Sequence, residues 1–147
     1  MRKRSDRRND ILVTYADTEG KSGQFYAVKY AEANRVSSKN IASSLAFSNA
    51  TRRLPAPPSM IVFVDDLIST GRSFASNFRN FVAYNSSILK QLGAPVTIMA
   101  LSVTSEGEQF IRRMLEEFDW LNIDLVYADL VSSFDRAFSV RRLFLDN

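Results

Sequence analysis

The chain of 147 residues contains no cysteine and no histidine. Without cysteine it can form no disulfide, no thiolate nucleophile and no cysteine-ligated zinc or iron–sulfur site. Without histidine it can build neither a Ser–His–Asp triad nor a zinc site with imidazole ligands. Any chemistry must therefore use carboxylates, hydroxyls, lysine or arginine side chains, backbone N–H groups, or a metal that a ligand brings.

Glycine, proline and long apolar runs are also scarce. Five glycines, four prolines and 46% hydrophobic residues fit one globular domain with a buried core. No apolar stretch approaches the roughly 18 residues that a membrane span needs. The basic N-terminus is followed by Asn9 and Asp10 rather than by the apolar segment of a signal peptide. We therefore expect a soluble, cytoplasmic protein without membrane contact.

The net charge of +3 is concentrated at the N-terminus. Residues 1–8 hold five cations and one carboxylate, a sum of +4, so residues 9–147 sum to −1. We expect residues 1–9 to form a basic arm and residues 10–147 to form a single domain. The arm is either a solvated terminus or a contact to nucleic acid or another acidic partner, and the sequence leaves both open.

Strand-like and helix-like segments alternate along the chain. Apolar runs predict strands at 11–15, 60–64, 96–103 and 123–127. Helical spacing predicts helices over 24–34 and 74–92, the second ending at Gly93, and a third that starts from a capping box of Ser105 and Glu108. Residues 35–59 predict a loop with one short helix near 41–47 and no clear second strand. This alternation indicates an α/β fold: a mostly parallel central sheet with helices on both faces.

The segment from Ile61 to Ser73 carries the chemistry. Four apolar residues are followed by the adjacent carboxylates Asp65 and Asp66, and then by a Ser-Thr-Gly-Arg-Ser turn that opens a helix. Gly71 permits a positive φ, and the helix N–H groups with the nearby hydroxyls can hold a phosphate. The carboxylates suit sugar hydroxyls or a divalent cation, so the pattern indicates a sugar phosphate. The alternative is a capped helix after a buried strand, with solvated carboxylates.

This segment resembles the binding motif for 5-phosphoribosyl 1-diphosphate (PRPP) of the type I phosphoribosyltransferases at all 13 positions from 61 to 73. The resemblance implies that Asp65 and Asp66 are the catalytic pair that contacts the ribose 2′- and 3′-hydroxyls. It also implies a Mg²⁺ ion held mainly by PRPP and water, with no direct protein ligand. The 5′-phosphate would be held by Ser69, Thr70, Gly71, Arg72 and Ser73. The likeness spans about residues 10–130.

An earlier loop fits the same resemblance. Members of that family bind diphosphate between the first core strand and the next helix, which makes Lys21, Ser22 and Gly23 candidates for diphosphate contacts. An ordinary turn between strand and helix explains the segment equally well. A P-loop interpretation of Gly20-Lys21-Ser22 fails, because position 15, where that motif needs glycine, is Tyr15.

Other family features are missing from the pattern. Neither a catalytic loop nor a base-reading hood is recognisable, so we expect a core with a reduced or absent hood, in a chain that lacks C-terminal elements. Phe134 follows the last strand, where it could stack on a base or simply pack. Three stretches, 21–34, 63–71 and 134–139, resemble phosphoribosyltransferase-like domains of bacterial conflict and anti-phage systems.

The resemblance implies an enzyme that transfers phosphoribose from PRPP to a nitrogen nucleophile and releases diphosphate, as an effector in a bacterial defence system. The alternative is a non-catalytic module that binds PRPP or a nucleotide within a larger complex. A receiver-like phosphoacceptor domain would share the acidic pair and the parallel sheet, but it would not explain the Ser-Thr-Gly-Arg-Ser loop. We expect the protein to act as a homo- or hetero-oligomer.

Overall fold

Five strands form one parallel sheet in the order β2-β1-β3-β4-β5. The computed structural model describes residues 7–16 and 22–131. The strands are β1 (Ile11–Tyr15), β2 (Ile41–Ser43), β3 (Met60–Ile68), β4 (Val96–Thr104) and β5 (Ile123–Val131). Because the strands all run the same way, their carboxyl ends meet at one edge, where α/β sheets bind their ligands.

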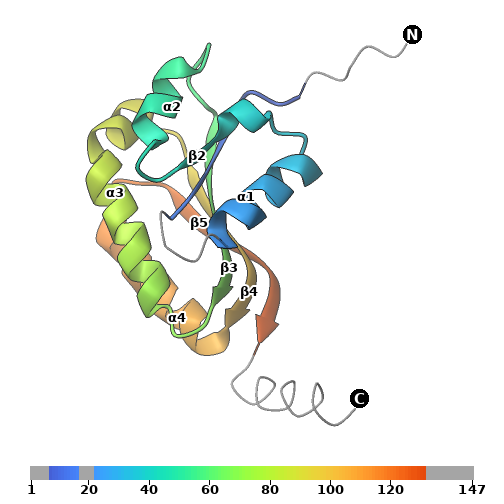
Figure 1. The fold of residues 1–147 in the computed structure, drawn as a ribbon. Coiled ribbons are helices and arrows are strands. Elements are labelled where there is room, and N and C mark those ends of the chain that lie inside the picture. The colour runs from blue at the N-terminus through green and yellow to red at the C-terminus, as the bar shows by residue number, and fades with distance from the viewer. Residues whose placement is uncertain (1–6, 17–21, 132–147) are drawn as a thin grey trace, which may run out of the picture.

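Four helices cover the two faces of this sheet, as the sequence predicts (Figure 1). They are α1 (Ser22–Ala33), α2 (Phe47–Arg53), α3 (Arg72–Leu92) and α4 (Ser105–Leu115), with short 3₁₀ turns at Ser38–Asn40 and Glu116–Phe118. Helix α1 packs on one face of β1 and β3, and the other three helices lie on the opposite face. Within the described ranges, no helix has the length and apolar character needed to cross a lipid bilayer.

Phenylalanine side chains hold α3 to the sheet. Phe63 of β3 is 1% exposed, and its ring centroid lies 5.7, 5.4 and 5.1 Å from those of Phe74, Phe78 and Phe81. Phe47 of α2 joins the same cluster, 5.1 Å from Phe81 and perpendicular to it. Edge-to-face and tilted aromatic pairs at these separations add to the stabilisation from burial alone. The cluster therefore fixes the start of α3 relative to the end of β3.

The prediction for residues 35–59 is wrong in two respects. Residues 41–43 form strand β2, which pairs in parallel with β1, and the helix begins only at Phe47. The buried Asn40 explains the strand, because its side-chain amide donates to the carbonyls of Asn9 (3.1 Å) and Ile11 (3.0 Å). Those two bonds place the following residues beside β1 without any apolar run in the sequence.

The strand predicted at 60–64, which is β3, ends later than predicted. β3 continues through Asp65 and Asp66 to Ile68, so the expected loop shrinks to residues 69–71. The strand continues because β4 pairs with it along this stretch, Asp65 with Ala100 and Ile68 with Val103. Alternation shifts here, since Phe63 and Ile68 both pack on the α3 side. β5 likewise extends beyond its predicted end at residue 127.

Candidate functional site

A pocket of about 240 Å³ lies at the carboxyl end of β3, where the strand passes into α3. The predicted residues Asp65, Asp66, Ser69, Thr70, Gly71 and Ser73 all line it. Asn77, one turn into α3, lines it too, and the motif gave no indication of that residue. Arg72 is exposed and is absent from the lining, so its predicted phosphate contact is limited to its backbone N–H.

Both carboxylates are held by the backbone that follows them. Oδ1 of Asp65 accepts from the N–H of Asp66 at 2.8 Å, and Oδ1 of Asp66 accepts from the N–H of Leu67 at 2.7 Å. The pKa of Asp65 is raised to about 7, and burial is the largest cause. The neighbouring Asp66 side chain also raises this pKa, and the Asp66 N–H lowers it by less. Asp65 therefore exchanges its proton near neutral pH, in the range where its charge can respond to a bound cation or hydroxyl.

The loop and the first turn of α3 offer donors to an anion. Gly71 has φ of 85°, a left-handed conformation that residues with a Cβ rarely adopt. The N–H of Arg72 donates to Oγ1 of Thr70 at 3.3 Å, and the N-cap residue Gly71 makes no side-chain cap to the N–H groups that follow. The N-terminus of a 21-residue helix thus presents uncapped N–H groups and the positive end of its dipole to the pocket.

Three residues of β4 and α4 contact the loop at residues 69–71 from outside the pocket lining. The sequence predicts none of them in this role. Thr104 is the N-cap of α4 in place of the predicted Ser105. Its Oγ1 accepts from the N–H of Gly107 at 2.9 Å and donates to the Ser69 carbonyl. A Cβ on Gly107 would lie 2.6 Å from the same carbonyl oxygen, and one on Gly71 would lie 3.0 Å from the Phe110 ring. In the sequence, the one possible signal for this support is the glycine at positions 71 and 107, where a Cβ would be too close to its neighbours.

The second predicted loop lies at the same edge of the sheet. Ser22 and Gly23 form the start of α1, and a Cβ on Gly23 would lie 3.3 Å from Cβ of Tyr15, the last residue of β1. Thr14 pairs with Phe63, so β1 ends one strand away from Asp65 and at nearly the same level. Lys21 and Phe134 lie outside the described residues.

The donor set at this edge fits a magnesium ion that arrives with its own ligands. No group of three or more acidic side chains in the described ranges could enclose a metal by itself. Asp65 and Asp66 are two oxygen donors beside a phosphate-sized loop. Mg²⁺ typically takes one or two protein carboxylates and completes its shell with phosphate oxygens and water.

Comparison with known proteins identifies the family. The sequence model of the PRTase-CE family matches residues 2–146, nearly the whole chain. The chain belongs to the PRTase-CE family. This is a phosphoribosyltransferase-like family, so the resemblance of the 61–73 segment is confirmed at the level of the family.

One solved structure shows a weak similarity to this PRTase-CE protein. The AQ2163 protein from Aquifex aeolicus matches with a TM-score of 0.46 and 12% identity over 84% of this chain. The match covers 56% of the AQ2163 chain, so the present chain spans little more than half its length. No curated protein matches.

Proposed function

We propose that this PRTase-CE protein binds PRPP with Mg²⁺ and transfers its phosphoribosyl group to a nitrogen nucleophile, with release of diphosphate. One observation carries the proposal. A single small pocket combines two adjacent carboxylates with an uncapped helix N-terminus and a left-handed glycine loop. The positive end of the helix suits a phosphate, and the carboxylates suit the two hydroxyls of a ribose.

The chemistry follows from this placement. The 5′-phosphate would bind the N–H groups of the 69–73 loop, while Asp65 and Asp66 accept hydrogen bonds from the ribose hydroxyls. Departure of diphosphate takes the electron pair of its bond to C1, and the nitrogen lone pair forms the new bond to the same carbon. Mg²⁺ supplies charge neutralisation on the leaving diphosphate. The chain's own residues fix the sugar so that C1 faces the attacking nitrogen.

The diphosphate would extend towards the start of α1. Ser22 and Gly23 begin that helix beside the end of β1, and β1 neighbours β3 in the sheet. Helix α1 therefore directs a second N-terminus to the edge that holds Asp65. An anion between the two helix N-termini would lie in favourable potential from both.

A non-catalytic PRPP-binding module is the second candidate. The observation that favours it is the origin of the lining residues, since those among residues 7–16 and 22–131 that line the pocket all belong to the segment 65–77. Such a pocket can bind a sugar phosphate, but a transferase also needs groups that hold the acceptor. We also propose a role in bacterial defence, which is compatible with either candidate, and loss of phage protection in cells carrying Asp65→Asn would support it.

Isothermal titration of the full chain with PRPP and Mg²⁺ tests both candidates. We expect Asp65→Asn and Asp66→Asn each to weaken binding about 10- to 100-fold, because each removes a charge-assisted hydrogen bond worth about 1.5–3 kcal/mol. Asp119→Asn, the same change at an exposed position, is the matched control and should bind as the wild type does. Absence of PRPP binding, or equal binding by all variants, would overturn both candidates.

Diphosphate release separates the two candidates once binding is established. The assay incubates the protein with PRPP, Mg²⁺ and a panel of nitrogenous bases, and measures free diphosphate. Release that depends on a base and disappears in Asp65→Asn supports the transferase. Tight binding without release under any base supports the binding module.

A further inference from the structure

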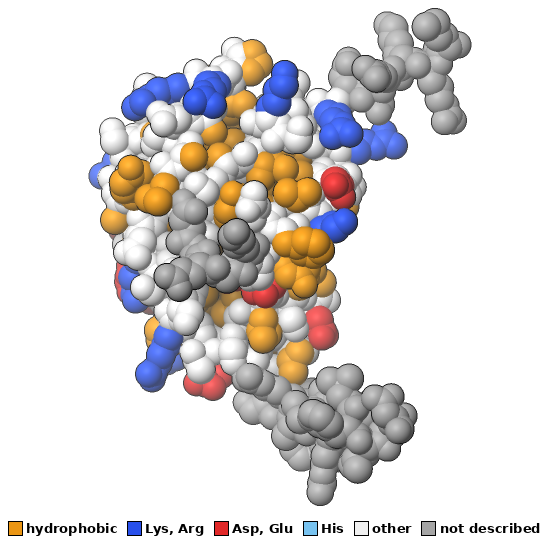
Figure 2. All heavy atoms as spheres, in the orientation of Figure 1, with side chains coloured by type: hydrophobic (Ala, Val, Ile, Leu, Met, Phe, Trp, Pro, Cys, Tyr) orange, Lys and Arg blue, Asp and Glu red, His pale blue; other side chains and the backbone are white. Residues whose placement is uncertain are grey.

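Exposed cations gather at the amino-terminal end of the sheet, opposite the proposed PRPP pocket. They form the basic end, defined as Arg7, Arg8, Arg35, Lys39, Arg52 and Arg53. Figure 2 shows Lys and Arg side chains along the upper end of the molecule, the end at which the strands of Figure 1 begin. Two carboxylates interrupt the group, and both are engaged: Asp10 pairs with Arg8 at 2.9 Å, and Glu32 pairs with Lys29 at 3.7 Å.

These cations come from three parts of the chain, and the structure brings the three together in two ways, by backbone contacts and by a shared depression. Arg8 bridges to Val36, with its N–H donating to the carbonyl of Arg35 at 2.7 Å. Arg7 and Arg35 line one shallow depression. Lys39 and Arg53 line a second and larger one. The positive charge of these described residues is therefore part of the surface of the folded domain.

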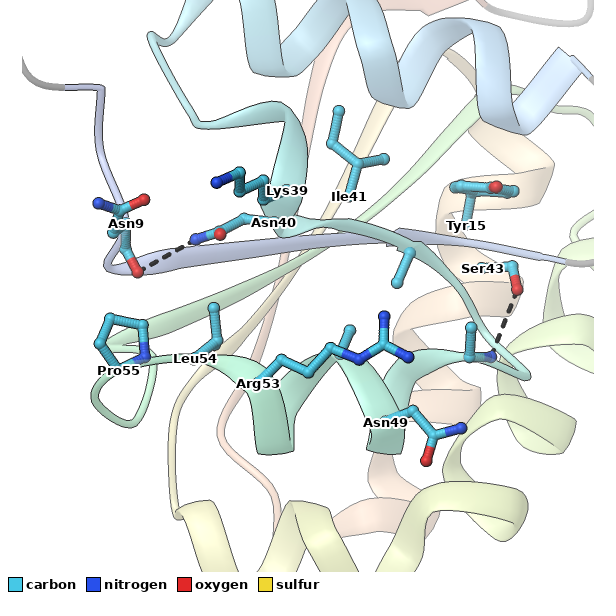
Figure 3. Close-up of a pocket in the computed structure, with 13 residues that line it drawn as sticks. Asn9, Tyr15, Lys39, Asn40, Ile41, Ser43, Asn49, Arg53, Leu54 and Pro55 are labelled. Atoms are coloured by element: carbon cyan, nitrogen blue, oxygen red, sulfur yellow. Dashed lines mark hydrogen bonds between the residues drawn. The ribbon is translucent and has the colours of Figure 1, made fainter.

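The larger depression, with a volume of about 810 Å³, lies between β2 and α2. Figure 3 shows the Arg53 side chain extending from α2 into this space, with Asn49 on the same helix and Lys39 near the start of β2. Neither Lys39 nor Arg53 has an ion-pair partner among residues 7–16 and 22–131. On the β2 side, the buried Asn40 amide is bonded to two carbonyls. Two unpaired cations, Lys39 beside β2 and Arg53 on α2, line this depression and suit an anionic group.

We propose that the basic end binds the phosphate backbone of a nucleic acid strand. Five of its six cations are arginines, and all of these except Arg8, which is paired with Asp10, can offer a planar guanidinium group to phosphate oxygens through two parallel hydrogen bonds. Two separate depressions lined by cations suit a ligand with repeated negative charges.

This surface is remote from the proposed PRPP pocket. Ser59, at the start of β3, donates to the Asp10 carbonyl beside the basic end, and Asp65 and Ile68 lie at the other end of that strand. The six residue steps from Ser59 to Asp65 span about 20 Å of strand. A strand of nucleic acid bound at the basic end can therefore coexist with a ligand in the PRPP pocket, and the inference stands whether or not PRPP binds.

Fluorescence anisotropy with a labelled 20-nucleotide RNA and the matching single-stranded DNA, at 50–300 mM NaCl, tests the proposal on the full chain. Arg53→Glu is compared with Arg113→Glu, because both arginines are exposed and lie in the last turn of a short helix. We expect Arg53→Glu to weaken binding about tenfold at 50 mM NaCl and to lower the salt slope by about 0.7, the value for one lost phosphate contact on a single strand. Arg113→Glu should bind nearly as the wild type does.

Three results would overturn the proposal. These are salt-independent or absent binding, equal weakening by Arg53→Glu and Arg113→Glu, and equally tight binding of poly-glutamate of matched charge. The third result would assign the basic end to an acidic protein partner. Lys39→Glu provides a second variant, and circular dichroism of each variant shows that a loss of binding is not a loss of fold.

Discussion

The contact between α4 and the loop at residues 69–71 makes one glycine decisive. Gly107 is the third residue of α4, and a Cβ there would lie 2.6 Å from the Ser69 carbonyl oxygen and 2.7 Å from that of Ile68. Ordinary contact begins at 3.4 Å, so Gly107→Ala would push the loop backbone away by about 0.8 Å, the difference between 3.4 and 2.6 Å. The obstacle is backbone, which cannot rotate aside as a flexible side chain can.

The sign of the effect distinguishes this contact from an ordinary helix position. Replacing glycine by alanine inside an exposed helix normally stabilises a protein by about 1 kcal/mol. Overpacking against a fixed neighbour typically costs about 1–3 kcal/mol, and we expect the upper part of that range, about 2–3 kcal/mol, because the Cβ would meet two backbone oxygens. We expect a net loss of about 1–2 kcal/mol for Gly107→Ala, together with weaker PRPP binding, because the displaced carbonyls belong to the loop that would hold the 5′-phosphate.

Urea denaturation at pH 7, followed by circular dichroism, measures this loss. Asn80→Ala, at an exposed position of α3, is the control and should be slightly stabilising because alanine favours the helix. A Gly107→Ala variant as stable as the wild type, or more stable, would refute the tight contact between α4 and the 69–71 loop. A destabilised variant with unchanged PRPP affinity would refute the link between that contact and the pocket.

Three further predictions concern stability. The pKa of Asp65 in the folded state is about 7, against 3.8 ordinarily. The stability that this protonated group contributes is therefore complete below about pH 4 and is lost as the pH rises to about 7. Allowing for solvent screening, Asp65→Asn should gain about 2 kcal/mol over the wild type at pH 8 and little at pH 4 in urea titrations; a pH-independent gain would contradict this. Asn85→Ala should cost about 1–3 kcal/mol in thermal unfolding, because the buried amide bonds the carbonyls of Ser44 and Phe81 at 3.0 Å, and the exposed Gln91→Ala should cost little. Phe63→Ala should cost about 3–5 kcal/mol by urea denaturation, since its ring contacts three other phenylalanines; a loss below 1 kcal/mol would argue against that cluster.

The parts of the fold that the sequence predicts are those governed by local pattern. The apolar runs of β1 and β3 reflect strands that are buried over most of their length, whereas β4 has one buried and one half-exposed face. The phenylalanine spacing of α3 reflects one face turned to the sheet. Gly93 ends α3 in a left-handed conformation, as expected. Each of these signals lies within a few residues of the feature that it predicts.

The parts that the sequence does not predict depend on distant residues. β2 has three residues and is located by bonds from Asn40 to a segment about thirty positions earlier. β3 outlasts its apolar run because β4 continues to pair with it past the carboxylates. Polar side chains do not end a strand whose backbone groups still have partners.

The candidate site divides in the same way. Its front, from Asp65 to Ser73, is one continuous segment and carries a motif that the sequence shows directly. Its support comes from Thr104, Gly107 and Phe110, which lie some 35 residues away along the chain and meet the loop only in the folded protein. No local pattern marks these residues, because a threonine cap and a helical glycine occur in many helices without any such contact.

The strand order also sets which part of the molecule opens first. β3, β4 and β5 are neighbours both in the chain and in the sheet, whereas β2 is a three-residue edge strand with β1 as its one partner. Local unfolding begins where few backbone bonds must break, so the amides of Ile41–Ser43 should exchange with deuterium well before those of β3 and β4. Since β2 forms one wall of the depression that contains Arg53, such opening would widen that depression without disturbing the carboxyl edge that holds Asp65.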